Sequence, residues 1–531
     1  MRNCLRLLLV LGSLFILSEL FGQVRVPFSA RMNGGKIYYN DGRYDKAAEQ
    51  FALAVAENPN SAEARIWLGM ALAHQQKLLD AAGQFDTAYE LDTAYFNKMQ
   101  KNEDFKFQAL TSFSQATLAK INTNDTNEWQ TALSYIKKAL KIEPKSRQGL
   151  TLLAQLYILL NRLDELKASA WEIMKADSTN PLSYTMLGLF FFNQSNWDST
   201  HHYYLAAASH YEAQAKKAKA SLAQNLQVTD TIKLNTIVQS LITARKDRNP
   251  ERLRILIEDS LKAKSKLLVL TRMVDDLYLT ENELNTSFFR AGVASLQKAN
   301  LIKAKEEQEH YFSQAQFEFE QALKYNPVDL DAKHNLAFIF YQRGGLANDR
   351  RAMELYQEII KASVLTLADL PSSLGGLEDS ILALITNEVI AQKYLPIPPE
   401  LSVKIANELF KRGSMLTEPS WLYFLNAQVS KPIDKKEVFL SKLTPQALEN
   451  LYLLYGSAQA NVAMGEKQEN NSEAAQKNYE AAIASFQLVL ALNPKNTDAI
   501  KSMGVCLSEL GRKQEAFELL KRLEDLKKEK R

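Results

Sequence analysis

The pair of residues best spaced for chemistry is Ser295 and Lys298, which fits the Ser-x-x-Lys spacing of some acyl-transfer enzymes. The other motifs of such a site are absent from the sequence, and the pair falls inside a segment with helical character. The sequence also has no phosphate-binding Gly-rich loop, no His-Glu-x-x-His helix and no Gly-x-Ser-x-Gly elbow. We therefore interpret the serine–lysine pair as a chance match and expect that the protein is not an enzyme.

Histidine and cysteine could instead hold a metal ion, and His201, His202 and His210 lie close together in the sequence. Adjacent side chains on a helix diverge by about 100°, so His201 and His202 do not easily share one ion. Paired cysteine ligands are absent, because the chain has only Cys4 and Cys506. Cys506 lies among apolar residues, which favours a small buried hydrophobic side chain over a reactive thiol. We expect neither a metal nor another cofactor.

The elements that would position any site are indicated by a repeat near the N-terminus. Its four marked residues recur at an offset of 34: Gly35, Ala47, Phe51 and Ala54 are followed by Gly69, Ala81, Phe85 and Ala88. The small residues let two helices of one unit approach closely, and the phenylalanines fill the space against the neighbouring unit. A proline then stops the second helix, because it lacks an N–H and its ring clashes with the preceding turn. Similar helix endings recur along the chain, at Pro59, Pro144, Pro327 and Pro494.

This period and its small–aromatic–small order resemble the tetratricopeptide repeat, a helix–turn–helix unit. The resemblance implies an all-α fold, a right-handed α-solenoid of tetratricopeptide helix–turn–helix repeats with helical insertions. One unit cannot bury its own apolar face, so stability comes from stacking of neighbours. With only 19 glycines and 14 prolines in 531 residues, the composition agrees with helix. We predict at least seven repeats and no sheet of more than two strands.

In this family the first helices of successive repeats line a concave groove that usually holds an extended or helical peptide. By resemblance, the partner-binding positions are on three first helices, and they are Lys36, Tyr39, Asn40, Met70, His74, Leu189, Phe192 and Asn193. Met32, Ile66 and Thr185 belong to the same faces. Their mix of apolar and hydrogen-bonding groups suits an amphipathic partner segment or a later helix of this same chain.

The repeat marks divide the chain into six parts. We expect a signal peptide at 1–22, an N-terminal repeat block at 28–214, a basic helical insertion at 215–285, middle repeats at 286–362, a linker with one helix at 363–399, and a C-terminal helical and repeat block at 400–531. Between Lys216 and Arg272 there are 13 Lys and Arg residues against 5 Asp and Glu residues. This excess is interpreted as a solvated helix face, with an anionic membrane surface or an acidic protein as alternatives and nucleic acid as the weakest.

The N-terminus has the layout of a secretory signal peptide. Arg2 and Arg6 precede an apolar run from Leu7 to Leu17, and Gly22 is a small residue suited to the cleavage site. The competing interpretation is an uncleaved anchor, but the run is shorter than the roughly 20 residues that a membrane span needs. We expect an exported protein that is periplasmic or envelope-associated, with N-terminal membrane anchoring as the alternative.

Two classes of function remain open from the sequence. The first is a non-catalytic protein–protein interaction scaffold of the cell envelope that binds partner segments in the concave groove. The second is an envelope protein that binds carbohydrate or nutrients and is built on repeat helices, like glycan-binding outer-membrane lipoproteins that use this motif. The second class wants a lipid-attached cysteine after the signal, whereas Cys4 lies before the apolar run. The net charge of +3 argues for no particular partner.

Overall fold

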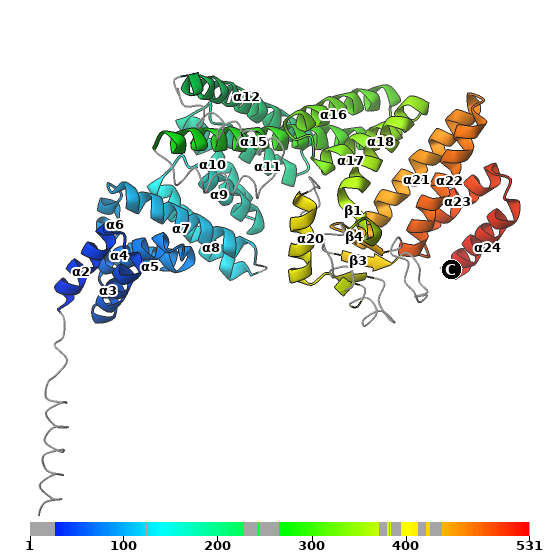
Figure 1. Cartoon of the computed structure of the whole chain (residues 1–531). Helices are drawn as coiled ribbons and strands as arrows, with labels where there is room; N and C mark the ends of the chain where they lie inside the picture. The colour runs from blue at the N-terminus through cyan, green and yellow to red at the C-terminus, as the bar shows by residue number, and fades with distance from the viewer. Residues whose placement is uncertain are drawn as a thin grey trace, which may run out of the picture. The chain divides into compact units, whose positions relative to one another are not determined.

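The computed structural model describes residues 27–123, 125–227, 240, 243, 265–370, 380, 381, 383, 394–411, 421–424 and 438–529 (Figure 1). The predicted signal peptide, most of the basic insertion and most of the helix expected between Leu377 and Tyr394 lie outside these residues. The chain divides into two compact units, the first ending at Phe190 and the second beginning at Phe191. The domain ranges expected from the sequence stay a prediction.

The first unit is built from antiparallel helix hairpins. Its helices are α2 (Phe28–Asn40), α3 (Tyr44–Glu57), α4 (Ala62–His74), α5 (Leu78–Leu91), α6 (Thr93–Met99), α7 (Glu103–Ile121), α8 (Thr126–Ile142), α9 (Arg147–Leu159), α10 (Leu163–Ala176) and most of α11 (Pro181–Asn193). Helices α2 and α3, α4 and α5, α7 and α8, and α9 and α10 pack as pairs. The short helix α6, which the repeat pattern does not predict, lies between the second and third hairpins in the chain and packs against α4 and α5.

The second unit contains the other described helices, several of which are longer than those of the first unit. They are α12 (Trp197–Gln227), α15 (Ser265–Leu301), α16 (Lys305–Tyr325), α17 (Leu330–Arg343), α18 (Leu346–Ser363), α20 (Pro399–Lys411), α21 (Pro445–Gln468), α22 (Ser472–Leu492), α23 (Thr497–Glu509) and α24 (Lys513–Glu529). Helices α12 and α15 pack against each other, and α15 packs on α16. The predicted insertion boundaries at 214 and 285 fall inside α12 and α15, so the described flanks of the insertion continue repeat helices.

A glycine–phenylalanine contact explains why the repeats keep their form. A Cβ atom added to Gly69 would lie 2.7 Å from Phe85 Cε1, closer than real Cβ contacts. Only glycine therefore lets the ring approach the first helix this closely. The same contact joins three further pairs, at Gly35 and Phe51, Gly292 and Phe319, and Gly456 and Phe486.

The spacing of these pairs shows how the long hairpins remain repeats. Sixteen residues separate Gly69 from Phe85, whereas 27 separate Gly292 from Phe319 and 30 separate Gly456 from Phe486. The additional residues amount to about three and four helical turns. Because whole turns are added, the same face of each helix still meets its partner. The chain is an all-α solenoid of helix–turn–helix repeats with lengthened members.

One prediction of local structure is wrong, because the second unit contains a four-stranded antiparallel sheet. Its strands are β1 (Val364–Thr366), β2 (Tyr394–Pro396), β3 (Trp421–Phe424) and β4 (Val438–Ser441), in the order β1-β4-β3-β2. The strands are only three or four residues long, and their partners are far apart in the sequence, so no local alternation indicates them. The sheet joins the repeat core, since Val364 and Phe439 pack in the cluster formed by α21, α22 and α23.

Two local predictions are confirmed near this sheet. Strand β2 ends at Pro396 and α20 begins at Pro399, as expected from three prolines in four residues. Thr444 caps α21, because its side-chain oxygen accepts a hydrogen bond from the Ala447 N–H and Pro445 takes the first helical position.

Candidate functional site

The predicted N-terminal binding positions lie in a network of contacts within the first unit. Tyr39 is buried, and its hydroxyl donates a hydrogen bond to the Asp104 carboxylate of α7. His74 Nε2 lies 3.1 Å from Asp104 Oδ1, and its ring stacks on Tyr44 with a centroid separation of 4.1 Å. The structure thus brings Tyr39 and His74 together on one carboxylate.

The protonation states of Asp104 and Tyr39 favour the hydrogen bonds of this network. Burial alone would raise the pKa of the Asp104 carboxyl, but hydrogen bonds from Tyr39, His74 and Gln108 outweigh burial and lower the pKa. The pKa of Tyr39 is raised, chiefly by burial and then by its bond to Asp104. Tyr39 therefore stays a neutral donor and Asp104 a charged acceptor at neutral pH. The arrangement joins α2, α4 and α7 and holds them together.

The other N-terminal positions divide between buried and exposed. Met70 is 1% exposed, so it packs inside the repeats and does not line a groove. Lys36 Nζ lies 2.6 Å from Glu63 Oε1 and 5.3 Å from the centroid of the Trp67 ring. Asn40 is exposed. Met70 and Tyr39 are thus buried in the described structure, and the partner-binding role expected of them stays a prediction.

The three positions predicted on α11 lie near the boundary between the units. Leu189 and Phe192 are half-buried, and Asn193 is exposed. The Phe192 ring packs edge-on against Trp197, with centroids 5.6 Å apart, and the Arg290 guanidinium lies 4.9 Å from the centroid of the same ring. Phe192 therefore already has an aromatic and a cationic neighbour within the second unit.

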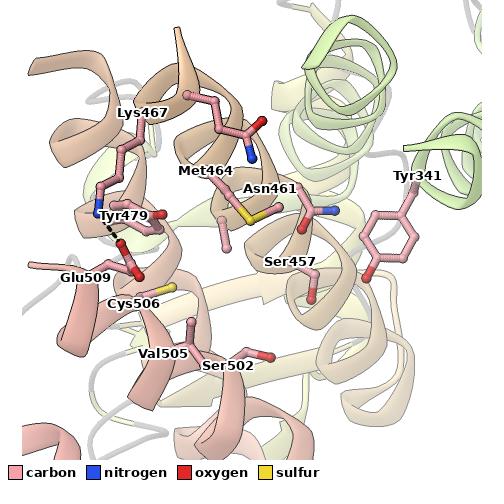
Figure 2. A pocket seen from close by; sticks show the side chains of 12 residues that line it. Tyr341, Ser457, Asn461, Met464, Lys467, Tyr479, Ser502, Val505, Cys506 and Glu509 are labelled. Atoms are coloured by element: carbon pink, nitrogen blue, oxygen red, sulfur yellow. Dashed lines mark hydrogen bonds and ion pairs between the residues drawn. The ribbon is translucent and has the colours of Figure 1, made fainter. Parts of the chain in front are cut away.

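An open cavity lies instead among the C-terminal repeats. It has a volume of about 570 Å³ and is bordered by α17, α21, α22 and α23. Figure 2 shows side chains from α17, α21 and α23 facing this cavity, and they include Tyr341, Ser457, Asn461, Met464, Val505 and Glu509. We call this surface the C-terminal groove and define it by these six residues.

The C-terminal groove combines exposed apolar groups with polar ones. Met464 is 53% exposed and Val505 is 61% exposed, although both border the cavity. At one end, Lys467 Nζ lies 2.7 Å from Glu509 Oε2, an ion pair that Figure 2 marks with a dashed line. Asn461 donates a hydrogen bond to Asp349 Oδ1 at 3.2 Å, which leaves its amide oxygen beside the cavity. The groove can make both apolar contacts and hydrogen bonds.

A second cavity lies farther along α17 and α21, which also border the first cavity. Its volume is about 520 Å³, and it is bordered by His334 and Phe338 of α17 and by Ala447 of α21. Along α21, residues bordering the two cavities run from Ala447 to Gln468, a length of about 30 Å at 1.5 Å per residue. Burial lowers the pKa of His334, and nearby Asp331 only partly offsets this. His334 is therefore neutral at pH 7 and presents an uncharged ring to this cavity.

Sequence reasoning missed the C-terminal groove, although the spacing of the N-terminal positions also marks it. Those positions lie one, four and five residues after the glycine of each first helix, as Met70 and His74 do after Gly69. The same offsets from Gly456 give Ser457, Ala460 and Asn461, and from Gly504 they include Val505 and Glu509. All five border the cavity. The same spacing therefore marks groove residues on the lengthened helix α21 and on the ordinary-length helix α23.

The residues singled out for chemistry are occupied elsewhere. Ser295 is buried and its Oγ donates a hydrogen bond to Glu318 Oε2 at 2.8 Å. Lys298 forms an ion pair with Asp198, and its pKa is raised, mainly by this contact, so it is a cation and not a base. His201 pairs with the same Glu318. The Ser295 hydroxyl and the Lys298 ammonium therefore each contact an acidic side chain, Glu318 and Asp198 respectively.

Cys506 is fully buried, which confirms the interpretation of this residue as a hydrophobic side chain. Burial raises the pKa of its thiol to about 12, so the nucleophilic thiolate is not formed at neutral pH. Across the described residues, no group of histidine, cysteine and acidic side chains is arranged to hold a metal ion. Within the same part of the chain, no helix combines the length and apolarity needed to cross a membrane.

Comparisons with known proteins point to one family. Models of the tetratricopeptide repeat match residues 32–95 and 473–529. No curated protein matches the chain in sequence. Among solved structures, a thermophilic tetratricopeptide-repeat protein of Thermus thermophilus is 19% identical and covers 35% of this chain and 91% of its own, with a TM-score of 0.20.

Two larger structures are similar over most of the chain. A human IFIT1 dimer with m7Gppp-AAAA is 12% identical, over 95% of this chain and 91% of its own, with a TM-score of 0.21. The APC/C hetero-tetramer Cut9–Hcn1 is 13% identical, over 96% and 95%, with a TM-score of 0.23. These scores are too low to bear on function. The two sequence matches, of which the first spans the Gly35–Phe51 and Gly69–Phe85 contacts, identify this chain as a tetratricopeptide-repeat protein.

Proposed function

We propose that this protein is a non-catalytic scaffold that binds an amphipathic segment of a partner protein in the C-terminal groove. Tetratricopeptide repeats imply protein–protein interaction in general, and both ends of the chain carry them. The observation that supports binding in the C-terminal groove is the exposure of Met464 and Val505 beside a cavity that also offers polar groups. Large apolar side chains exposed next to polar ones are typical of binding surfaces.

The dimensions of the groove favour a helical partner segment. A helix of about 20 residues spans the roughly 30 Å over which α21 borders the two cavities. Such a helix would place its apolar stripe on Phe338, Met464 and Val505, with its polar edges near Asn461 and the Lys467–Glu509 ion pair. This is the helix-in-groove mode of recognition.

The binding positions predicted in the N-terminal repeats have a secondary role in this proposal. Lys36, Asn40 and His74 are at least partly accessible, so a partner can still contact them. Tyr39 and Met70 support the fold there. We also retain export to the cell envelope as part of the proposal, supported by Arg2, Arg6 and the apolar run after them. Sequencing the N-terminus of the native protein checks this part, with Gln23 expected as the first residue.

A photo-crosslinking residue at Val505 tests the groove directly. The tagged protein is irradiated in native extract, the crosslinked segment is identified by mass spectrometry, and a synthetic peptide of that segment is titrated against the purified protein. Met464→Glu should weaken binding by on the order of 30-fold or more, because a charge would be buried in the contact.

The matched control is Phe107→Glu. Phe107 is 55% exposed on α7 of the first unit, so the change is similar in chemistry but far from the groove in sequence. Equal binding by the Met464 variant and the wild type would overturn the groove proposal. Crosslinks found with the probe at Lys36 or Asn40, and none at Val505, would move the site to the N-terminal face.

A further inference from the structure

The last described repeat has an exposed face at a position that is buried in the other repeats. Leu520 lies sixteen residues after Gly504, as Phe85 lies sixteen after Gly69. Phe85 is fully buried, whereas Leu520 is 46% exposed. Phe517 corresponds to the buried Ala82 and is 64% exposed. Helix α24 packs on α23, and no other described helix covers these two side chains.

Charges flank this apolar pair in a regular pattern. Lys513, Phe517, Leu520 and Glu524 are spaced four, three and four residues apart, and all four are exposed. This is the spacing of a coiled-coil seam, in which residues every 3.5 positions on average face a partner helix. Among the described residues, neither Lys513 nor Glu524 has an ion-pair partner. We call these four residues the α24 seam.

The sequence of residues along the α24 seam is self-complementary when two copies run antiparallel. The charged pair Lys513 and Glu524 and the apolar pair Phe517 and Leu520 have the same midpoint on the helix. A two-fold axis at that midpoint places Phe517 opposite Leu520 of the other copy. It also places Lys513 opposite Glu524, so each apolar layer lies between opposite charges. A parallel pairing would set lysine against lysine and glutamate against glutamate, which is unfavourable.

We propose that two copies of this chain associate through the α24 seam as an antiparallel, two-fold dimer. A membrane surface fits the seam less well, because basic and acidic residues alternate with the apolar ones, unlike helices that bind anionic lipid. The seam spans about 17 Å of one helix per copy, so the interface is small and the dimer is expected to depend on protein concentration. This proposal is independent of the C-terminal groove.

Sedimentation equilibrium of the full chain over a series of concentrations tests the dimer. Phe517→Glu should weaken association by on the order of 30-fold or more, because it buries a charge in the apolar layer. Phe107→Glu, a change of the same kind at another exposed phenylalanine, should leave association unchanged. Circular dichroism checks that each variant keeps its helix content, which is expected because the substituted side chains are exposed.

A charge exchange tests the register. Lys513→Glu alone and Glu524→Lys alone should each weaken the dimer, since like charges then face each other. The double variant Lys513→Glu/Glu524→Lys should restore it, because the opposite charges return with their places exchanged. A wild-type chain that stays monomeric, or a double variant as weak as the single ones, would overturn the proposal. Met464→Glu should leave the dimer intact, so a failure of the groove proposal is distinguishable.

Discussion

The N-terminal face and the C-terminal groove use the same positions of the repeat with opposite results. One residue after the glycine of the first helix, Met70 is 1% exposed and Val505 is 61% exposed. Five residues after it, His74 is held by Asp104, whereas Asn461 borders a cavity. In the first unit α7 packs against α4, and Asp104 of α7 ties Tyr39 to His74.

Repeat spacing thus identifies which face of a helix points toward the groove, but not which other helices pack on that face. Whether the face binds a partner depends on what covers it, and in the first unit an internal network does so. In the C-terminal repeats the lengthened helix α21 continues to Gln468, and its residues border the cavity up to that position. Substitutions at equivalent positions of the two regions test whether coverage explains this difference.

The largest expected effect is at the ring that fills the space between repeats. Phe85→Ala should destabilise the first unit by about 3–5 kcal/mol, because it leaves a cavity at a fully buried site. Leu520→Ala, at the equivalent position of the last described repeat, should cost less than about 1 kcal/mol at protein concentrations where the chain is monomeric, since Leu520 is then 46% exposed and leaves no closed cavity. Hydrogen exchange measured by mass spectrometry on peptides of α5 and α24 gives both local stabilities. Equal costs at the two sites would mean that Leu520 is covered in solution.

A smaller effect is expected at the glycine of the same contact. Gly69→Ala should cost about 1–3 kcal/mol by overpacking, because the new Cβ would lie 2.7 Å from Phe85 Cε1. Gly504→Ala should instead be neutral or stabilising by up to about 1 kcal/mol. Its Cβ would be 3.8 Å from Leu520 Cδ2, an ordinary contact, and alanine favours helix over glycine. Urea unfolding of the two variants checks the difference in sign.

The sequence predicted the parts of the fold that rest on local spacing. Gly35, Phe51 and their repeats follow from residue size, and the cap at Thr444 follows from hydrogen bonding at a helix start. The sheet could not be predicted, because Val364 pairs with Ser441 across 77 residues and each strand is too short to show a period.

The positions of the candidate site can be predicted from the sequence, but whether other helices cover them cannot. The offsets from Gly456 and Gly504 mark the groove residues in the sequence, but no sequence feature shows that Asp104 closes the N-terminal face. Burial of Met70 and Tyr39 depends on a helix from the next repeat, which is a tertiary contact. The spacing of residues along a helix can be read from the local sequence, whereas the helices that pack over a given face cannot.

The smallest expected effect is the pH dependence of the network that closes the N-terminal face. Burial would raise the pKa of Asp104, but the bonds from Tyr39, His74 and Gln108 lower it below its ordinary value of about 3.9. Between these two values the unfolded chain binds more protons than the folded one, so stability rises with pH there. The contribution is therefore present above about pH 4 and is lost as the pH falls through the folded-state value. The side chain is 39% exposed, so solvent screening limits the effect to below about 1 kcal/mol.

The substitution that isolates this effect is Asp104→Asn, which keeps the shape of the side chain and removes its charge. The difference in unfolding midpoint between wild type and variant should shrink as the pH falls below about 4. Tyr39→Phe is the matched control, because it removes one donor while His74 and Gln108 remain, and it should reduce the pH dependence only in part. A midpoint difference that stays the same down to pH 3 would show that the carboxylate charge does not hold this face closed, and packing of α7 on α4 would then be the whole reason that it differs from the groove.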